Sequence, residues 1–138
     1  MPYPEMMVAP MRAELTISGF NELKTTDEVI EKLDTMNGLT LLAVNSVCGC
    51  AAGSARPGLL QSLDNENTPN ELYTVFAGQD LDAVTKAREY MLPYPPSSPS
   101  IALFKDGKLV HFIERLQIEG RTAEMIATNL KAAYNEFK

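Results

Sequence analysis

The chain lacks most of the side chains with which proteins hold metal ions. Its 138 residues include only two cysteines and one histidine, His111. A zinc site takes four ligands, so carboxylates or a second chain would have to complete this set. Copper(I) on the two thiolates, with Met6, Met7 or Met11 nearby, is the better metal hypothesis. We expect a main function that uses no metal and no bound cofactor.

Positive charge is also scarce. Twelve Lys and Arg residues stand against eighteen Asp and Glu residues, which gives a net charge of −6, and the Lys and Arg residues form no run. Such a balance argues against binding to nucleic acid or to an anionic membrane surface. Small molecules and other proteins are therefore the expected partners.

Long apolar segments are missing as well. No stretch approaches the ~20 apolar residues that cross a bilayer. Residues 1–11 carry three prolines and Glu5 and lack the basic start and apolar run of a secretion signal. We therefore expect a cytoplasmic protein. A hydrophobic content of 45% in 138 residues is enough for one packed core, so residues 1–138 are expected to form a single domain.

The order of apolar patterns predicts an α/β fold. Thr25 and Glu28 form a capping-box pattern ahead of apolar residues at helical spacing. The nearly continuous apolar run Leu39–Val47 predicts a central strand covered on both faces. The other expected elements are strands over 20–24, 72–77, 101–104 and 109–113, and helices over 10–18, after the cysteines with a bend at Pro57, after a cap at Asp80, and over 122–137. Strands alternating with helices predict a mixed sheet with helices on both faces.

The two cysteines stand one residue apart, in Cys48-Gly49-Cys50, where the apolar run ends and a helical pattern begins. The thiolate is the nucleophilic form of cysteine, and the free N–H groups at a helix N-terminus favour it. No cationic side chain lies nearby in the sequence, so the helix terminus has to supply most of this effect. We expect a moderately lowered thiol pKa for Cys48 and redox activity for the pair.

The one-residue spacer opposes a relaxed disulfide. Residues two apart on a regular helix lie about 200° around its axis, whereas a disulfide holds its Cβ atoms about 3.8 Å apart. A bond between Cys48 and Cys50 is therefore expected to be strained and easily reduced, with some relief from Gly49 and from non-helical backbone at the cap.

Two parts of the chain resemble the thioredoxin fold, a three-layer α/β/α sandwich with a mixed central sheet. The cysteines follow a central strand, and the segment 98–107 (SPSIALFKDG) resembles the proline-preceded hairpin of that fold. The chain departs from thioredoxin itself in its spacer, in the absence of Trp before the cysteines and in the lack of a carboxylate on the preceding strand. It is more similar to the bacilliredoxin family over almost its whole length, in the segments CGCAAG, FAGQD, PPSSPS, IER and IEGR.

That resemblance implies a function. Bacilliredoxins reduce mixed disulfides between cytosolic proteins and bacillithiol, a small thiol that replaces glutathione. By resemblance Cys48 is the attacking cysteine and Cys50 the neighbour that resolves or protects. Gly49, Ser98 and Pro99 are the expected substrate-binding residues, with a cis Ser98-Pro99 bond and Ser98 backbone groups that face an extended chain. Bacillithiol and bacillithiol-blocked client proteins are the expected partners.

Other interpretations stay open at this point. The chain is also compatible with a general protein disulfide isomerase, with a copper(I)-binding module that uses Cys48 and Cys50, and with a redox-inactive adaptor. Arg56 and Arg115 are candidates for attracting an anionic thiol, although solvation at the surface is the more common use of arginine. His111 is a candidate proton carrier, because histidine is the residue type that ordinarily changes charge near neutral pH. Nothing in the sequence brings it to the cysteines, and a structural or surface role is expected.

Overall fold

The computed structural model describes residues 2–138, which contain five strands and seven helical segments. The strands are β1 (Asn21–Glu22), β2 (Leu39–Asn45), β3 (Glu71–Phe76), β4 (Ser100–Lys105) and β5 (Lys108–Ile113). The helices are α1 (Glu5–Thr16), α2 (Thr26–Leu33), the π-helical turn η1 (Ala51–Ala55), α3 (Arg56–Ser62), α4 (Leu81–Glu89), α5 (Arg115–Ile118) and α6 (Ala123–Phe137). No helix in this part of the chain is long and apolar enough to cross a membrane.

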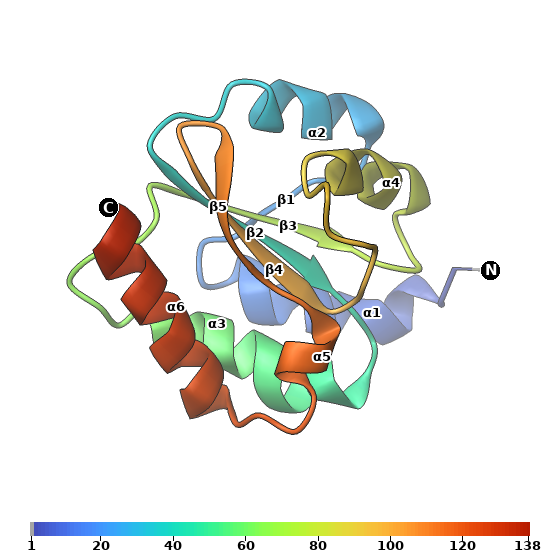
Figure 1. Cartoon of the computed structure of the whole chain (residues 1–138). Helices are drawn as coiled ribbons and strands as arrows, with labels where there is room; N and C mark the ends of the chain where they lie inside the picture. Colours follow the sequence, from blue (N-terminus) through green and yellow to red (C-terminus); the bar gives the residue numbers. More distant parts are fainter. Residues whose placement is uncertain (1) are drawn as a thin grey trace.

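The strands form one mixed sheet in the order β1-β3-β2-β4-β5 (Figure 1). β1, β3 and β2 run parallel, and β4 pairs antiparallel with both β2 and β5. Every residue of β2 is buried, as its nearly continuous apolar sequence predicted. The central strand is thus covered on both faces and ends where the cysteine segment begins.

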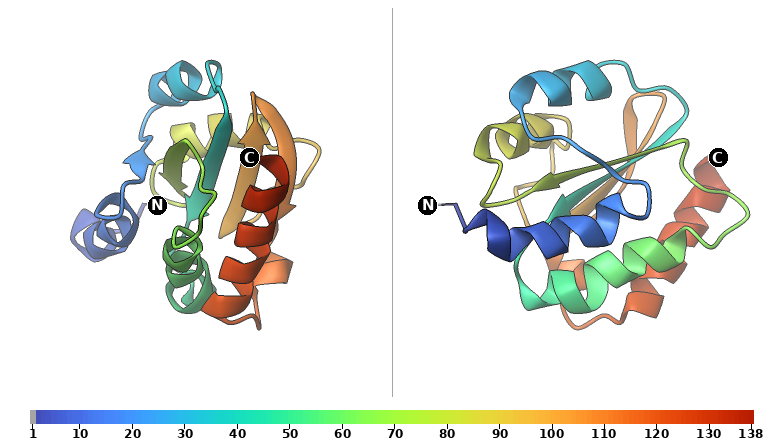
Figure 2. Two further views of the ribbon diagram at one scale, coloured as in Figure 1. Left: turned by 90° about the vertical axis from the view of Figure 1, so that its left-hand side faces the viewer. Right: turned by 180° about the vertical axis from the view of Figure 1, so that it is seen from behind.

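Alternate side chains of the strands enter two separate cores. Leu39, Leu41 and Ala43 of β2 pack with α1, α3 and α6 on one face of the sheet. Leu42 and Val44 pack with α2 and α4 on the other. Figures 1 and 2 show these two helical layers with the sheet between them. The expected three-layer α/β/α sandwich of thioredoxin type is confirmed.

The capping box read from the sequence at Thr25 and Glu28 is present in the structure. The Glu28 backbone N–H donates to Thr25 Oγ1 at 3.1 Å, and the Thr25 N–H donates to Glu28 Oε1 at 3.1 Å. These bonds complete the capping box that starts α2. Thr122 likewise accepts a hydrogen bond from the Met125 N–H at the start of α6.

Three elements differ from the sequence predictions. α1 begins at Glu5 and contains Pro10 in its interior, where a helix start had been expected. The segment after the cysteines is a π-helical turn followed by α3, with Pro57 in the first turn of α3. The short helix α5 was not predicted. Tertiary contacts override local preference in α1, since the buried side chains of Val8 and Leu15 hold it on the protein.

A buried cation joins α1 to the ends of β1 and α4. Arg12 forms ion pairs with Glu5 at 3.0 Å and with Glu22 and Asp80 at 2.7 Å, and its guanidinium lies over the Phe76 ring. Asp80 stands at the start of α4, as expected, but its carboxylate binds Arg12 and does not cap the helix. Burial opposes the charge on Arg12, whereas hydrogen bonds to the carboxylates outweigh burial and raise its pKa.

Replacing this cation should destabilise the fold. Arg12→Met leaves the mostly buried carboxylates of Glu22 and Asp80 without a counter-charge, and we expect a loss of about 3 kcal/mol in the free energy of unfolding, measured in urea. Arg12 also lowers the pKa of Glu5 through a hydrogen bond. The stability that this hydrogen bond contributes is present above the ordinary carboxyl pKa and is lost as the pH falls. The difference in the free energy of unfolding between Arg12→Met and the wild type should therefore decrease in acid. Lys32→Met on the surface of α2 is the control and should change stability by less than about 0.5 kcal/mol.

Candidate functional site

The cysteine segment forms the turn between β2 and the following helical region. Cys48 stands at the start of this region, because its carbonyl oxygen accepts hydrogen bonds from the N–H groups of Ala51 (3.0 Å) and Ala52 (3.2 Å). Cys48 and Cys50 are half-buried, and Gly49 between them is exposed. Cys50 also packs against the core on the α3 and α6 side of the sheet. The two sulfur atoms therefore lie at a helix N-terminus at the surface of the protein.

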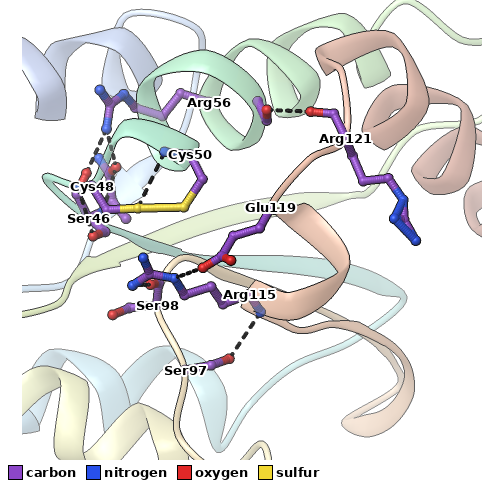
Figure 3. The surroundings of a disulfide bond; sticks show 11 residues. Ser46, Cys48, Cys50, Arg56, Ser97, Ser98, Arg115, Glu119 and Arg121 are labelled. Carbon is purple, nitrogen blue, oxygen red and sulfur yellow. Dashed lines mark hydrogen bonds and ion pairs between the residues drawn. A yellow bond between two sulfur atoms is a disulfide. The ribbon is translucent and has the colours of Figure 1, made fainter.

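The sulfur atoms of Cys48 and Cys50 are joined in a disulfide, with 5.5 Å between the Cα atoms (Figure 3). The Cys50 backbone N–H donates to Cys48 Sγ at 3.3 Å, and the Cys48 N–H donates to Ser46 Oγ at 3.1 Å. An N–H group aimed at a sulfur stabilises negative charge on that sulfur. The backbone thus favours the thiolate of Cys48 once the disulfide is reduced. The strain expected of this bond stays a prediction.

Gly49 makes no close contact that would require a glycine. A Cβ atom built on it meets nothing within 4 Å, so this side of the motif is open to a ligand. Its predicted substrate-binding role stays a prediction.

The loop before β4 lies beside the disulfide. The Ser98-Pro99 peptide bond is cis, as expected, and a second cis bond at Leu92-Pro93 was not predicted. Ser100, the first residue of β4, pairs with Val44 of β2, which places Ser98 and Pro99 next to the strand that leads into the motif. In Figure 3, Ser98 lies below the disulfide. The structure therefore brings together the two segments on which the sequence analysis placed the site.

Arg56 lies buried under the motif, with 2% of its surface exposed. Its Nη1 donates to Asn45 Oδ1 at 2.9 Å and to the Ser46 carbonyl at 2.8 Å, and its Nε lies 3.1 Å from Glu14 Oε1 of α1. The expectation of surface solvation is wrong for this arginine. The sequence analysis also found no cation near the cysteines, whereas α3 brings Arg56 to the residue that accepts the Cys48 N–H. One signal in the sequence could have indicated this role. Arg56 is the first charged residue after Asp34, in a stretch that is otherwise uncharged.

Arg115 approaches from the other side of the disulfide (Figure 3). Its Nη1 donates to the Ser98 carbonyl at 3.3 Å, and its Nε pairs with Glu119 at 2.5 Å. The Ser98 carbonyl, predicted to face a substrate chain, therefore already has one hydrogen-bond donor. Arg115 fixes the outer side of the cis-proline loop and remains partly exposed.

The remaining candidates lie outside this arrangement. His111 on β5 forms a 2.6 Å hydrogen bond with Asn129 of α6, which fits the expected structural role. Among residues 2–138, no group of three His, Cys, Asp or Glu side chains is placed to hold a metal ion. A metal on Cys48 and Cys50 would thus lack a third ligand of these types.

Comparison with known proteins links this site to thiol chemistry. The sequence profile of the family described as disulphide isomerase matches residues 3–138. The bacilliredoxin of Cytophaga hutchinsonii is 61% identical over 134 residues, which cover 97% of this chain and 98% of the relative. The bacilliredoxin BH1716 of Halalkalibacterium halodurans is 53% identical, over 97% of this chain and 93% of the relative. These similarities span nearly the whole of each chain.

Solved structures support the fold assignment. The thioredoxin of Fasciola hepatica superposes with a TM-score of 0.57 at 16% identity and covers 86% of this chain and all of that one. The oxidised thioredoxin of Plasmodium falciparum gives a TM-score of 0.58 at 14% identity, over 84% of this chain and 99% of that chain. At such low identity the similarity establishes the thioredoxin-like fold alone.

The backbone around Cys48 predicts an acidic thiol. The test uses a reduced Cys50→Ser variant, which keeps the N–H at position 50. Alkylation of Cys48 by iodoacetamide should reach half its maximal rate at a pH below about 8.5, which is the ordinary pKa of a thiol. Adding Arg56→Lys should shift this midpoint upward by up to about one pH unit, because a single ammonium group cannot reproduce the guanidinium contacts. A midpoint at or above the ordinary value with Arg56 intact would contradict the interpretation.

Proposed function

Because this chain belongs to the bacilliredoxin family of thiol–disulfide oxidoreductases, we propose that it removes bacillithiol from mixed disulfides on client proteins. Cys48 is the proposed nucleophile, and Cys50 is the proposed resolving residue. Bacillithiol acts as the thiol substrate, and the reaction requires no bound cofactor. We place this activity in the reducing cytoplasm, where blocked protein thiols need such an enzyme.

One observation carries the proposal. The Cys48 sulfur accepts an N–H group at a helix start, is bonded to Cys50, and lies beside the loop with the cis Ser98-Pro99 bond. A nucleophilic thiolate needs stabilised negative charge and access to the surface. A resolving thiol has to reach the first sulfur directly. The disulfide between the two residues meets that requirement.

The proposed reaction has two exchange steps. The Cys48 thiolate attacks the bacillithiol sulfur of the mixed disulfide, and the client thiolate leaves and takes up a proton. The Cys50 thiolate then attacks Cys48 Sγ, which releases bacillithiol and leaves the Cys48–Cys50 disulfide. Two thiol molecules, which leave as their own disulfide, or one dithiol reductant supply the two electrons that restore the dithiol. In this proposal, the Cys48–Cys50 disulfide is the product of the second step.

The surroundings support substrate approach from the open side of the motif. Gly49 is exposed, and the Ser98-Pro99 loop lies beside the disulfide (Figure 3). An extended client segment that carries the blocked cysteine can lie along such a loop. The Arg115 side chain donates a hydrogen bond to the Ser98 carbonyl and so holds the loop. We expect the loop to keep this position when substrate binds.

A general protein disulfide isomerase is the second candidate, because the family profile that matches this chain is described as disulphide isomerase. Isomerisation also begins with attack by Cys48, but it acts on disulfides between protein cysteines. The turnover rates on the two kinds of substrate distinguish the two activities. Faster turnover of scrambled protein disulfides than of bacillithiol-blocked clients would favour isomerisation.

Trapping tests the roles of the two cysteines. Cys50→Ala removes the resolving thiol, so Cys48 should retain bacillithiol as a stable adduct after reaction with a blocked client, detected by intact-protein mass spectrometry. Cys48→Ala is the matched control. It should form little adduct and reduce turnover to background, because the attacking sulfur is lost. Equal trapping by both variants would refute the assignment of Cys48 as the nucleophile.

A further inference from the structure

A hollow of about 550 Å³ opens behind the cis-proline loop. Its walls come from α4, from the loop before β4 and from the start of α5, and they include Arg88, Pro96, Ser97, Ser98, Glu114 and Arg115. Ser98 belongs both to this hollow and to the loop beside the disulfide (Figure 3). Ser98 therefore links the hollow to the loop beside the disulfide.

Arg88 is the unusual residue of this hollow. Its Nε is buried and has no hydrogen-bond partner, and over residues 2–138 no carboxylate lies within ion-pairing distance of its guanidinium. Burial lowers the pKa of Arg88, with no opposing contribution from a nearby carboxylate. A partly desolvated cation without a counter-charge is unfavourable by itself. An anion bound in the hollow would remove that cost.

The other charges around the hollow are already engaged. Arg115 pairs with Glu119 and donates to the Ser98 carbonyl. The Glu114 carboxylate accepts a backbone N–H in the capping box of α5. Arg88 is thus the lining charge that the protein leaves without a partner. Two arginines, Arg88 and Arg115, and one carboxylate, Glu114, thus line the hollow of a protein with a net charge of −6.

We propose that this hollow binds the anionic group of the small thiol, taken here to be a carboxylate, with Arg88 as its ion-pair partner, while the thiol sulfur lies at Cys48. This assignment rests on the proposed function, since it identifies where the anionic portion of that thiol is held. Guanidinium groups pair with carboxylates in a planar, two-bond geometry. The hollow then selects thiols that carry a carboxylate over neutral thiols.

The test compares two mixed disulfides of one client protein, one with bacillithiol and one with neutral 2-mercaptoethanol. Arg88→Gln should lower kcat/KM for the bacillithiol disulfide about tenfold, mainly through KM, as expected for the loss of one partly desolvated ion pair. Turnover of the 2-mercaptoethanol disulfide should stay within about twofold. Arg88→Lys keeps the charge and should recover part of the loss.

Arg121→Gln is the matched control. Arg121 is exposed, and Figure 3 shows its side chain directed away from the disulfide. This variant removes the same charge from the protein and should leave both substrates unaffected. Equal losses on both substrates in Arg88→Gln, or no loss on either, would overturn the proposal. Far-UV circular dichroism and melting curves identify a variant that fails to fold, and Arg88→Lys then decides the question.

A second measurement separates this proposal from the proposed function. Succinate, a dicarboxylate without a thiol, should bind the oxidised protein weakly and shift the backbone amide signals of Ser97, Ser98 and Arg115 in NMR spectra. Arg88→Gln should abolish these shifts. If the wild type fails to release bacillithiol from the client, the proposed function falls, yet succinate binding that depends on Arg88 still supports an anion subsite. Absence of succinate shifts in the wild type would overturn the subsite.

Discussion

The buried guanidinium of Arg56 connects the parts of the protein on which the cysteine site depends. It binds the end of β2 through Asn45, the turn before the cysteines through the Ser46 carbonyl, and α1 through Glu14. Asn45 also donates to the Met11 carbonyl of α1. A buried cation is tolerated only when such partners compensate its lost hydration. The position of the Cys48 turn is therefore tied to the central strand and to the first helix at once.

Control of the Cys48 sulfur comes mostly from backbone groups. The Cys50 N–H reaches the sulfur and Ser46 holds the Cys48 N–H, so the short spacer places a donor directly at the reacting atom. Arg56 acts one step further away, through Ser46. This arrangement gives the sulfur a fixed environment that backbone N–H groups provide. The side facing Gly49 is left open for substrate.

Patterns that depend on neighbours in the chain could be predicted from the sequence. The capping box of Thr25, the buried central strand and the cysteine pair at a helix start all follow from local residue order. The cis Ser98-Pro99 bond was expected only from the resemblance to a known family. Features that join distant segments could not be predicted. Asp80 resembles a helix cap in sequence but binds Arg12, 68 residues away along the chain.

The arginines around the site illustrate the same limit. In the sequence, Arg56 and Arg88 are both cations in helical segments, and no local pattern distinguishes their roles. Arg56 is paired because α1 brings Glu14 to it, whereas Arg88 faces a hollow whose carboxylate, Glu114, is occupied in a helix cap. Whether an arginine supports the fold or remains available to a ligand depends on which acidic side chains the tertiary structure brings close to it. Spacing in the sequence does not contain that information.

Taken as a whole, the net charge of −6 opposes both a thiolate and an anionic substrate. Salt screens exposed charges beyond about 8 Å at physiological ionic strength, so distant carboxylates contribute little at the cysteines. Local groups decide instead. The backbone N–H groups favour the anion on Cys48, and Arg115 lies at the neighbouring loop. An acidic protein can therefore present a locally favourable surface to an anion.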